Sequence, residues 1–558
     1  MTALKAEFRT IWELFKELWL NRCYRYSCIA ITLLSFITLL THPTVGIDDT
    51  AFSLYFVDGV APATGRWCLY LLHKVIPLGY NPYIIEFIGI LIWNVSVTLW
   101  CSIFRQIVGK SISIWVYIVF ACTMISSPIL SELLVWYLHN GIFVAYGITA
   151  LAVLTFTTAL LEAVSRQTRV ICFMVSVLLL SIALGFYESM MIVFLMGAMM
   201  FYLLLFITKA KRYLLRLWNW LGAFLFCAGA SLLLRTVIIQ LICVFFHLDD
   251  QKGILESRGL HEFFQWFSEE KGWSAFFAVM RDFFIKYYID ATVFLPITVT
   301  VLAIVILLII GFSYAIRRRS FPIFFCVIAI ILLPWVLPVL EGTTTPYRSS
   351  QYIPLLCGFA ALLLFREIHT RKVNGVLRWA VILCTIFILT RQTIEMNKWF
   401  YLDAVKYEDA KQTMESVSLY IQENCDSSKP VCVIGSYEIP QGLISSAYSP
   451  NWSKRTKLAK FLIVTLFGSE VWSDYETPHG YAVAETPLLS VIEWGTHAFQ
   501  RLDTELAKFC DMHGIFFQAD NNPSHYANAL QTFAESPSWP QKGSVVEQED
   551  HIVVNFGI

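Results

Sequence analysis

The feature that most constrains this chain is a series of long apolar segments. They lie at about 26–41, 83–103, 111–127, 141–161, 169–185, 189–208, 217–237, 291–315, 321–340, 351–365 and 374–394. Crossing roughly 30 Å of hydrocarbon takes about 20 residues as an α-helix, and about half as many as a barrel strand. The sequence therefore predicts a mainly α, polytopic membrane helix bundle of about 11 spans.

The composition agrees with a membrane protein. The 558 residues are 57% hydrophobic and 15% charged, which is too apolar for a soluble chain of this length. A basic stretch of about 25 residues precedes the first apolar segment, and no small-residue cleavage site follows that segment. A cleavable signal peptide is therefore not expected.

The last part of the chain differs from the rest in charge and pattern. Residues 395–558 hold 11 Lys and Arg against 21 Asp and Glu, a net charge of −10, and residues 1–394 hold 30 against 20, a net charge of +10. Helical periodicity over 404–425, the strand-like KPVCVIGS and the terminal HIVVNFGI predict an α/β domain at 395–558, after a transmembrane domain at 1–394. This acidic domain lacks the cluster of basic residues with which proteins bind nucleic acid, so no nucleic-acid partner is expected.

Basic residues mark every second connection between the apolar segments. These connections hold Arg105 and Lys110; Arg166 and Arg169; Lys209, Lys211, Arg212 and Arg216; Arg317, Arg318 and Arg319; and Arg366, Arg371 and Lys372. The intervening connections 128–140 and 185–188 hold none, and 341–350 holds only Arg348. Because cytoplasmic loops are enriched in Lys and Arg, the N-terminus is predicted in the cytoplasm. The loop 42–82 and the domain 395–558 are then extracytoplasmic.

The long connection 238–290 is aromatic and mixed in charge. It includes FFQWFSEEKGWSAFFAVMRDFFIKYY, in which apolar rings alternate with charged residues. Such a segment is better placed lying in the membrane interface than crossing the bilayer. One or two surface helices are predicted here.

The first outer loop carries the candidate catalytic groups. It reads HPTVGIDDTAFSLYFVDGVAPATGRW and holds the adjacent carboxylates Asp48 and Asp49, then Asp58, and Arg66 behind Gly65. Removing a charged group from water at the membrane surface costs free energy, so charged residues placed there usually serve a function. By the predicted topology Glu132, Glu188, Arg235 and Arg348 lie on or near the same outer side.

These residue types suit sugar transfer from a lipid phosphate. An attacking hydroxyl needs a base, for which Asp48 or Asp49 is the candidate, and the departing phosphate needs cations. Arg66, Arg348 and Arg235 can supply them through charge-assisted hydrogen bonds. A single in-line displacement with one base would invert the anomeric centre. The two aspartates can equally hold a divalent cation.

Each of these residues also has a purely structural interpretation. Asp49 can cap the helical pattern that follows it, although a cap leaves Asp48 unexplained, and Asp58 before Gly59 fits a turn. Arg66 and Arg235 can be interfacial anchors that reach lipid headgroups. Glu188 and Glu132 can stabilise helix N-termini. Arg348, the only cation of its loop, remains a candidate beside serines and threonines that can also bind oxygen.

The sequence gives little sign of a metal or disulfide framework. The 11 histidines show no ligand spacing, and HExxH, GxSxG and P-loop motifs are absent. Most of the cysteines fall in the apolar part, where they act as small apolar residues. Cys425, Cys432 and Cys510 lie in the C-terminal part, where one disulfide is possible.

With these motifs in hand, the chain resembles the GtrII glucosyltransferase family, polytopic enzymes of the GT-C class. The likeness rests on GIDDTAF followed by GRW in the first outer loop, supported by GFYES before the sixth span and by PYRSSQYIP. It covers roughly residues 25–400. Glu188 stands where the family often has a Tyr-Gln pair, which is a departure from the pattern.

The resemblance implies transfer of glucose, or a related hexose, from undecaprenyl phosphate to a surface glycan such as an O-antigen repeat of lipopolysaccharide. It places the enzyme in the bacterial inner membrane with its site outside, and it implies that Asp48 and Asp49 are catalytic. The alternatives are a GT-C transferase of another sugar that acts on lipid A or protein, and a flippase for lipid-linked glycans. A flippase would favour broken helices and pseudo-repeated halves, which the sequence does not show.

Overall fold

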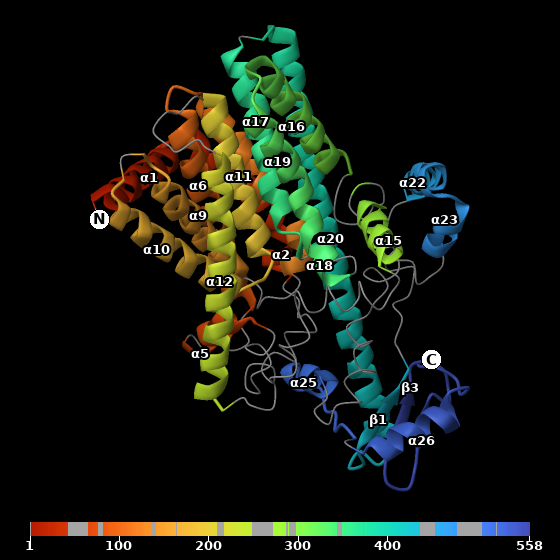
Figure 1. The fold of residues 1–558 in the computed structure, drawn as a ribbon. Helices are drawn as coiled ribbons and strands as arrows, with labels where there is room; N and C mark the ends of the chain where they lie inside the picture. The colour runs from red at the N-terminus through yellow and green to blue at the C-terminus, as the bar shows by residue number, and fades with distance from the viewer. Residues whose placement is uncertain are drawn as a thin grey trace. The chain divides into compact units, whose positions relative to one another are not determined.

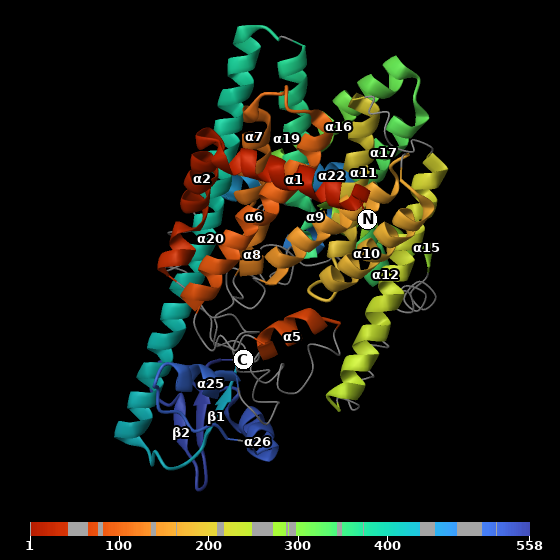
Figure 2. The ribbon, with the colours of Figure 1, turned by 90° about the vertical axis from the view of Figure 1, so that its left-hand side faces the viewer.

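A computed structural model describes residues 2–42, 65–75, 82–134, 141–162, 164–208, 217–247, 272–285, 288, 297–342, 349–371, 373–435, 452–476, 505–520 and 522–557 (Figures 1 and 2). The chain separates into two compact units. The larger unit ends at Asn397, and the smaller takes most of its residues from Lys398 onward. Each unit is described by itself below.

Ten helices among the described residues are long and apolar enough to cross a membrane, which confirms the mainly α polytopic fold. These spans are α2 (Arg22–Thr41), α6 (Pro82–Val108), α9 (Gly141–Ala159), α10 (Arg166–Leu184), α11 (Met190–Thr208), α12 (Leu217–Phe245), α16 (Ile297–Arg318), α17 (Phe321–Leu332) with η4 (Leu333–Trp335) and α18 (Val336–Glu341), α19 (Tyr352–Thr370) and α20 (Gly375–Asn424). Every one of them covers an apolar segment predicted from the sequence.

The remaining predicted segment, 111–127, forms the shorter helix α7 (Ile114–Ile125). Its 12 residues rise only about 18 Å, which is less than the hydrocarbon thickness. Ser113 and Ser126 flank the helix, and every residue from Val116 to Ile125 is buried. The apolar character of α7 therefore serves packing against α19 and α6 rather than contact with lipid.

The most buried spans of the larger unit are α6, α9, α11 and α19. Helix α9 packs against α6 and α10, and α11 packs against α9 and α17. Small side chains allow these close approaches: the Ser96 hydroxyl of α6 donates a 2.7 Å hydrogen bond to the Phe143 carbonyl of α9. By contrast, most of α12 is exposed although it is apolar on all sides, as expected of a helix that faces lipid.

The basic N-terminal stretch forms an amphipathic helix, α1 (Thr2–Leu20), which lies across rather than along α12 in Figure 1. Ile11, Leu14 and Leu18 share its buried face at helical spacing. Glu17 on this helix is ion-paired with Arg105, at 3.3 Å, and with Lys110. The helix is thereby fixed to the basic connection that follows α6.

The segment predicted to lie in the membrane interface is partly described. Helix α12 continues past the predicted end at 237 as far as Phe245, and α15 (Trp273–Phe284) forms a separate short helix. The exposed rings of Trp273 and Phe277 lie on α15, while Phe283 on the same helix is buried. The helix is thus amphipathic, and its position in the interface stays a prediction.

The last predicted span and the first helix predicted beyond it are one helix. α20 runs without a break from Gly375 to Asn424, 50 residues in all. No proline occurs within it, and Gly375 is its only glycine, so nothing in the sequence interrupts the backbone hydrogen bonds.

The smaller unit contains a three-stranded sheet. Strand β3 (Ile552–Asn555) pairs in parallel with β1 (Val431–Ile434) and antiparallel with β2 (Val545–Glu547), in the order β1-β3-β2. The segments predicted as strands from KPVCVIGS and HIVVNFGI are therefore neighbours in one sheet. Helices α22 (Trp452–Phe467) and α23 (Ser469–Glu476) are also described in this part of the chain.

Helices cover both faces of this sheet, which explains why β1 and β3 are buried along their whole length. One face packs against the end of α20 and against α25 (Glu505–Met512), and the other against α26 (Pro523–Phe533). The buried residues of α20 recur at heptad-like spacing; they are Tyr407, Ala410, Met414, Val417 and Ile421. The unit therefore has its own α/β core.

The three C-terminal cysteines are all free, so the disulfide allowed by the sequence is not formed. Cys432 belongs to the cluster under α26, whereas Cys510 belongs to the cluster on the opposite face of the sheet. Cys425 packs at the margin of the second cluster. Burial raises the pKa of Cys432 and of Cys510 to about 12, which keeps both as thiols.

Candidate active site

The described part of the site begins at Gly65, directly before α5 (Trp67–Val75). Gly65 has φ of +88°, a conformation that favours glycine. A methyl group at this position would lie 1.9 Å from Nη2 of Arg235 and 3.3 Å from Oε1 of Glu188. A side chain at this position would be strained by the positive φ, and the guanidinium of Arg235 would have to shift away.

The residues after Gly65 are fixed to the turn between α10 and α11. The Cys68 amide donates a 2.9 Å hydrogen bond to the Gly185 carbonyl, and the Cys68 thiol donates a 3.3 Å bond to the Ile182 carbonyl. The Trp67 indole lies against Gly185, where an added methyl group would meet Nε1 of the ring at 2.5 Å. The GRW and GFYES motifs, about 120 residues apart in sequence, are therefore in contact.

The side chain of Arg66 lies over the ring of Tyr187. The guanidinium carbon is 4.9 Å from the ring centre, a cation–π distance. The Tyr187 hydroxyl is 3.2 Å from the Ser349 hydroxyl, so a hydrogen bond joins them. Tyr187 is only 3% exposed. The buried ring therefore links the first motif to the loop before α19.

Arg235 and Glu188 form an ion pair, with Nη2 of Arg235 2.8 Å from Oε1 of Glu188. The two side chains are 17% and 34% exposed. A lone guanidinium within an apolar helix such as α12 would be costly, and the carboxylate offsets that cost. Glu188 therefore keeps the guanidinium of Arg235 beside Gly65 and prevents it from turning toward solvent.

The described site has one net positive charge, from Arg66 and Arg235 against Glu188. The hydroxyl groups of Tyr187 and Ser349 belong to the same site, and one of their two O–H groups is used in the hydrogen bond between them. Guanidinium groups and hydroxyls that converge from separate segments are suited to an anion with several oxygens, such as a phosphate.

The structure brings together three of the predicted site residues: Arg66, Arg235 and Glu188. Glu132 lies on α8 (Ile129–Leu134), but its side chain is outside the described residues. Asp48, Asp49 and Arg348 also lie outside them. Ser349, which follows Arg348 in the chain, is described and belongs to the site. The catalytic, metal-binding and substrate-binding roles of all these residues remain predictions.

Sequence reasoning did not single out Tyr187, Ser349 or Gly185. Tyr187 could have been identified from its position next to Glu188 in GFYES, and Ser349 from its position next to Arg348. Nothing in the sequence identified Gly185, because its role depends on the close approach of Trp67. These three residues belong to the site because of contacts between helices, not because of a local sequence pattern.

The chain was compared with known proteins. Comparisons with curated proteins and with solved structures found no match. In a scan against protein families, residues 37–365 match the family described as glucosyl transferase GtrII. The matched region contains every described residue of the site, from Gly65 to Ser349. The predicted resemblance is thus confirmed, and the chain belongs to the GtrII glucosyl transferase family.

Proposed function

We propose that this protein transfers glucose, or a related hexose, from a polyprenyl-phosphate carrier to a cell-surface glycan such as an O-antigen repeat. The family supports a glycosyltransferase. The donor proposal rests on one observation: the guanidinium of Arg66 lies over the ring of Tyr187, and the guanidinium of Arg235 is paired with Glu188, the next residue in the chain. A pair of such cations is what a departing lipid phosphate requires.

In the proposed reaction an acceptor hydroxyl attacks the anomeric carbon of the donor sugar. Asp48 or Asp49 takes the proton of that hydroxyl as general base. The bond between the anomeric carbon and the phosphate oxygen breaks, and the lipid phosphate leaves with the electron pair. Arg66, Arg235 and Arg348 stabilise the added charge on the phosphate. One displacement inverts the configuration at the anomeric carbon.

The Glu188–Arg235 pair acts in this scheme as a positioning pair. The carboxylate contacts Nη2 of Arg235 at 2.8 Å, which restricts where the guanidinium lies. Because two acceptors on one guanidinium share its donors, Glu188 also moderates how tightly the phosphate product is held. Glu132 is proposed as a further substrate contact on the outer side of the bundle.

We further propose that the site lies on the extracytoplasmic face of the bacterial inner membrane, with the N-terminus in the cytoplasm. The support is the alternation of basic connections. A thiol engineered at Thr50 would be labelled by a membrane-impermeant maleimide added outside cells with a permeabilised outer membrane. Labelling only after the inner membrane is opened would contradict this orientation and the donor chemistry that depends on it.

The activity is tested with purified protein, labelled polyprenyl-phosphate-glucose and candidate glycans. We expect transfer by the wild type, and a loss of at least about 100-fold in Asp48→Asn or Asp49→Asn, because general base catalysis contributes roughly that much. Asp58→Asn, in the same loop and predicted to be a turn residue, is the matched control. Full activity in both single variants and in the double variant would remove the aspartates from the mechanism.

A further inference from the structure

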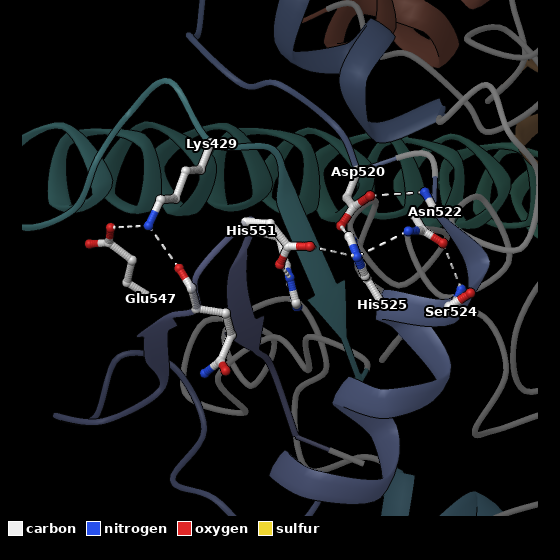
Figure 3. Close-up of polar contacts among 9 residues, drawn as sticks. Lys429, Asp520, Asn522, Ser524, His525, Glu547 and His551 are labelled. Carbon is white, nitrogen blue, oxygen red and sulfur yellow. Dashed lines mark hydrogen bonds and ion pairs between the residues drawn. The ribbon is translucent and has the colours of Figure 1, made fainter.

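The smaller unit contains a cluster of histidine and aspartate side chains that the proposed glycosyl transfer does not use. It consists of Asp520, His525, Asp550 and His551 (Figure 3). Asp520 follows the bridge residue Ala519, His525 lies in the first turn of α26, and Asp550 and His551 directly precede β3. Folding of the sheet brings these three segments together.

The side chains are in direct contact. Oδ2 of Asp520 is 2.7 Å from Nδ1 of His525, and Oδ2 of Asp550 is 3.1 Å from Nε2 of the same ring. Oδ1 of Asp550 is 2.7 Å from Nδ1 of His551. The two imidazole rings are stacked, with centres 4.2 Å apart and planes 8° from parallel.

The backbone holds these groups in place. The Asp520 amide donates to the Val431 carbonyl at 3.0 Å, and the Ile552 amide donates to the Pro430 carbonyl at 2.9 Å. Both bonds attach the cluster to the end of β1. The side chains of Asp520 and His551 are only 5% and 10% exposed. Asp520, His525 and His551 are therefore mostly buried and held by the fold, whereas the Asp550 side chain is 64% exposed at the edge of the cluster.

The groups around His525 include metal-ligand types from three chain segments. Nδ1 of the ring is 2.7 Å from Oδ2 of Asp520, and Nε2 is 3.0 Å from Nδ2 of Asn522 and 3.1 Å from Oδ2 of Asp550. Imidazole nitrogens and carboxylate oxygens are ligands that divalent transition metals accept.

We propose that Asp520, His525 and His551 bind one divalent transition-metal cation, with Asp550 orienting the imidazoles. One ligand atom from each of the three lies within 4.8 Å of the others, and around a cation with ligand bonds of about 2.0–2.2 Å they would move closer. Two imidazole nitrogens and a carboxylate suit Zn²⁺ and its neighbours rather than Ca²⁺ or Mg²⁺.

Such a cation would connect α26 to the start of β3. Metal bound to the folded state and not to the unfolded chain stabilises the fold. The site is therefore assigned a structural role in the smaller unit. It is independent of the proposed sugar transfer, because none of its ligands lies within the family-matched region 37–365.

The experiment uses the full-length protein in detergent, stripped with EDTA and then freed of EDTA. Zn²⁺ binding is measured by competition with a chromophoric chelator and by metal analysis after gel filtration. We expect about one Zn²⁺ per chain in the wild type, and at least a tenfold weaker affinity in His525→Ala and His551→Ala. His513→Ala is the matched control, since His513 lies in the same unit and contacts Tyr407 instead.

Two further variants distinguish a loss of Zn²⁺ binding from a loss of folding. His551→Gln retains a hydrogen-bond donor for Asp550 but is a poor metal ligand, so we expect a folded protein with weakened Zn²⁺ binding. EDTA should lower the thermal midpoint of the wild type and not that of His551→Gln. Equal Zn²⁺ content in the wild type and in the His525→Ala/His551→Ala double variant, or no binding by the wild type at tens of micromolar Zn²⁺, would overturn the proposal and leave a hydrogen-bonded cluster only.

Discussion

Gly65 and Arg235 are in contact, although they are 170 residues apart in sequence: a methyl group added to Gly65 would lie 1.9 Å from Nη2 of Arg235. This contact defines the described part of the site. It sets the GRW motif of the first outer loop against a charged pair that is supplied by α12 and by the turn before α11.

Replacing Gly65 by alanine should therefore damage the site. The new methyl group clashes with the guanidinium, and a φ of +88° is itself unfavourable for alanine. We expect a loss of at least about 2 kcal/mol, or a rearranged ion pair with transfer activity reduced at least tenfold. Thermal unfolding in detergent and the transfer assay measure both effects.

Gly222→Ala is the control for this change. Gly222 lies within α12, and among the described residues no atom beyond its chain neighbours and the adjacent helix backbone is within 4 Å of an added methyl group. Alanine is the better helix former, so this variant should match or slightly exceed the wild type in stability. An equally stable and active Gly65→Ala protein would show that the close approach is not needed.

Glu188→Gln should destabilise the protein by about 1–3 kcal/mol, because it leaves the guanidinium of Arg235 partly buried without its counter-charge. Adding Arg235→Gln should recover part of the loss, since the unpaired charge is then gone. The measurement is a double-mutant cycle of thermal unfolding in detergent. Strictly additive effects of the two changes would contradict a functional ion pair.

Arg348→Ala should weaken use of the donor. If Arg348 contacts the lipid phosphate, its loss removes a charge-assisted hydrogen bond of about 1.5–3 kcal/mol, and the KM for polyprenyl-phosphate-glucose should rise about tenfold or more. Arg166→Ala is the control, because Arg166 is exposed at the start of α10 on the predicted cytoplasmic side. An unchanged dependence on donor concentration would argue against this assignment.

The stability of the smaller unit should depend on pH through His513. Burial is the main cause that lowers the pKa of His513 below its usual value of 6.5, and its Nε2 is 2.7 Å from the Tyr407 hydroxyl. The unfolded chain therefore binds a proton at a higher pH than the folded chain. The resulting stability is fully present above about pH 6.5 and falls as the pH drops through that value toward the lowered pKa.

His513→Gln removes this titration and keeps a polar group beside Tyr407. Thermal midpoints of the wild type should fall between pH 7 and pH 5.5 more steeply than those of the variant. Parallel curves for the two proteins over this range would contradict the role of His513.

Much of the transmembrane fold could be predicted because its cause is local. Each apolar segment must form a helix to satisfy its own backbone hydrogen bonds in hydrocarbon, whatever its neighbours are. Neighbouring elements decide the remaining details. Segment 111–127 forms the short helix α7, which is buried from Val116 to Ile125, and the helix of the last span continues as α20 to Asn424.

The site was predicted in part for a related reason. Charged residues at the outer ends of apolar segments, such as Arg66, Arg235 and Glu188, are visible in the sequence because they are costly there. The pairing of Arg235 with Glu188 and the stacking of Arg66 on Tyr187 were not visible. The sequence also gave no ligand spacing among the histidines, since His525 and His551 meet only when α26 and β3 pack together.

The sequence by itself thus determined the membrane class, the helices and the residue types available for chemistry, because hydrophobicity and backbone hydrogen bonding act segment by segment. Tertiary structure alone decided that the GRW motif contacts the GFYES motif and that Gly65 lies against the guanidinium of Arg235. It also decided that the His and Asp residues of the smaller unit form one cluster. Those contacts join residues far apart in the chain, and only the packing of helices and strands against one another selects them.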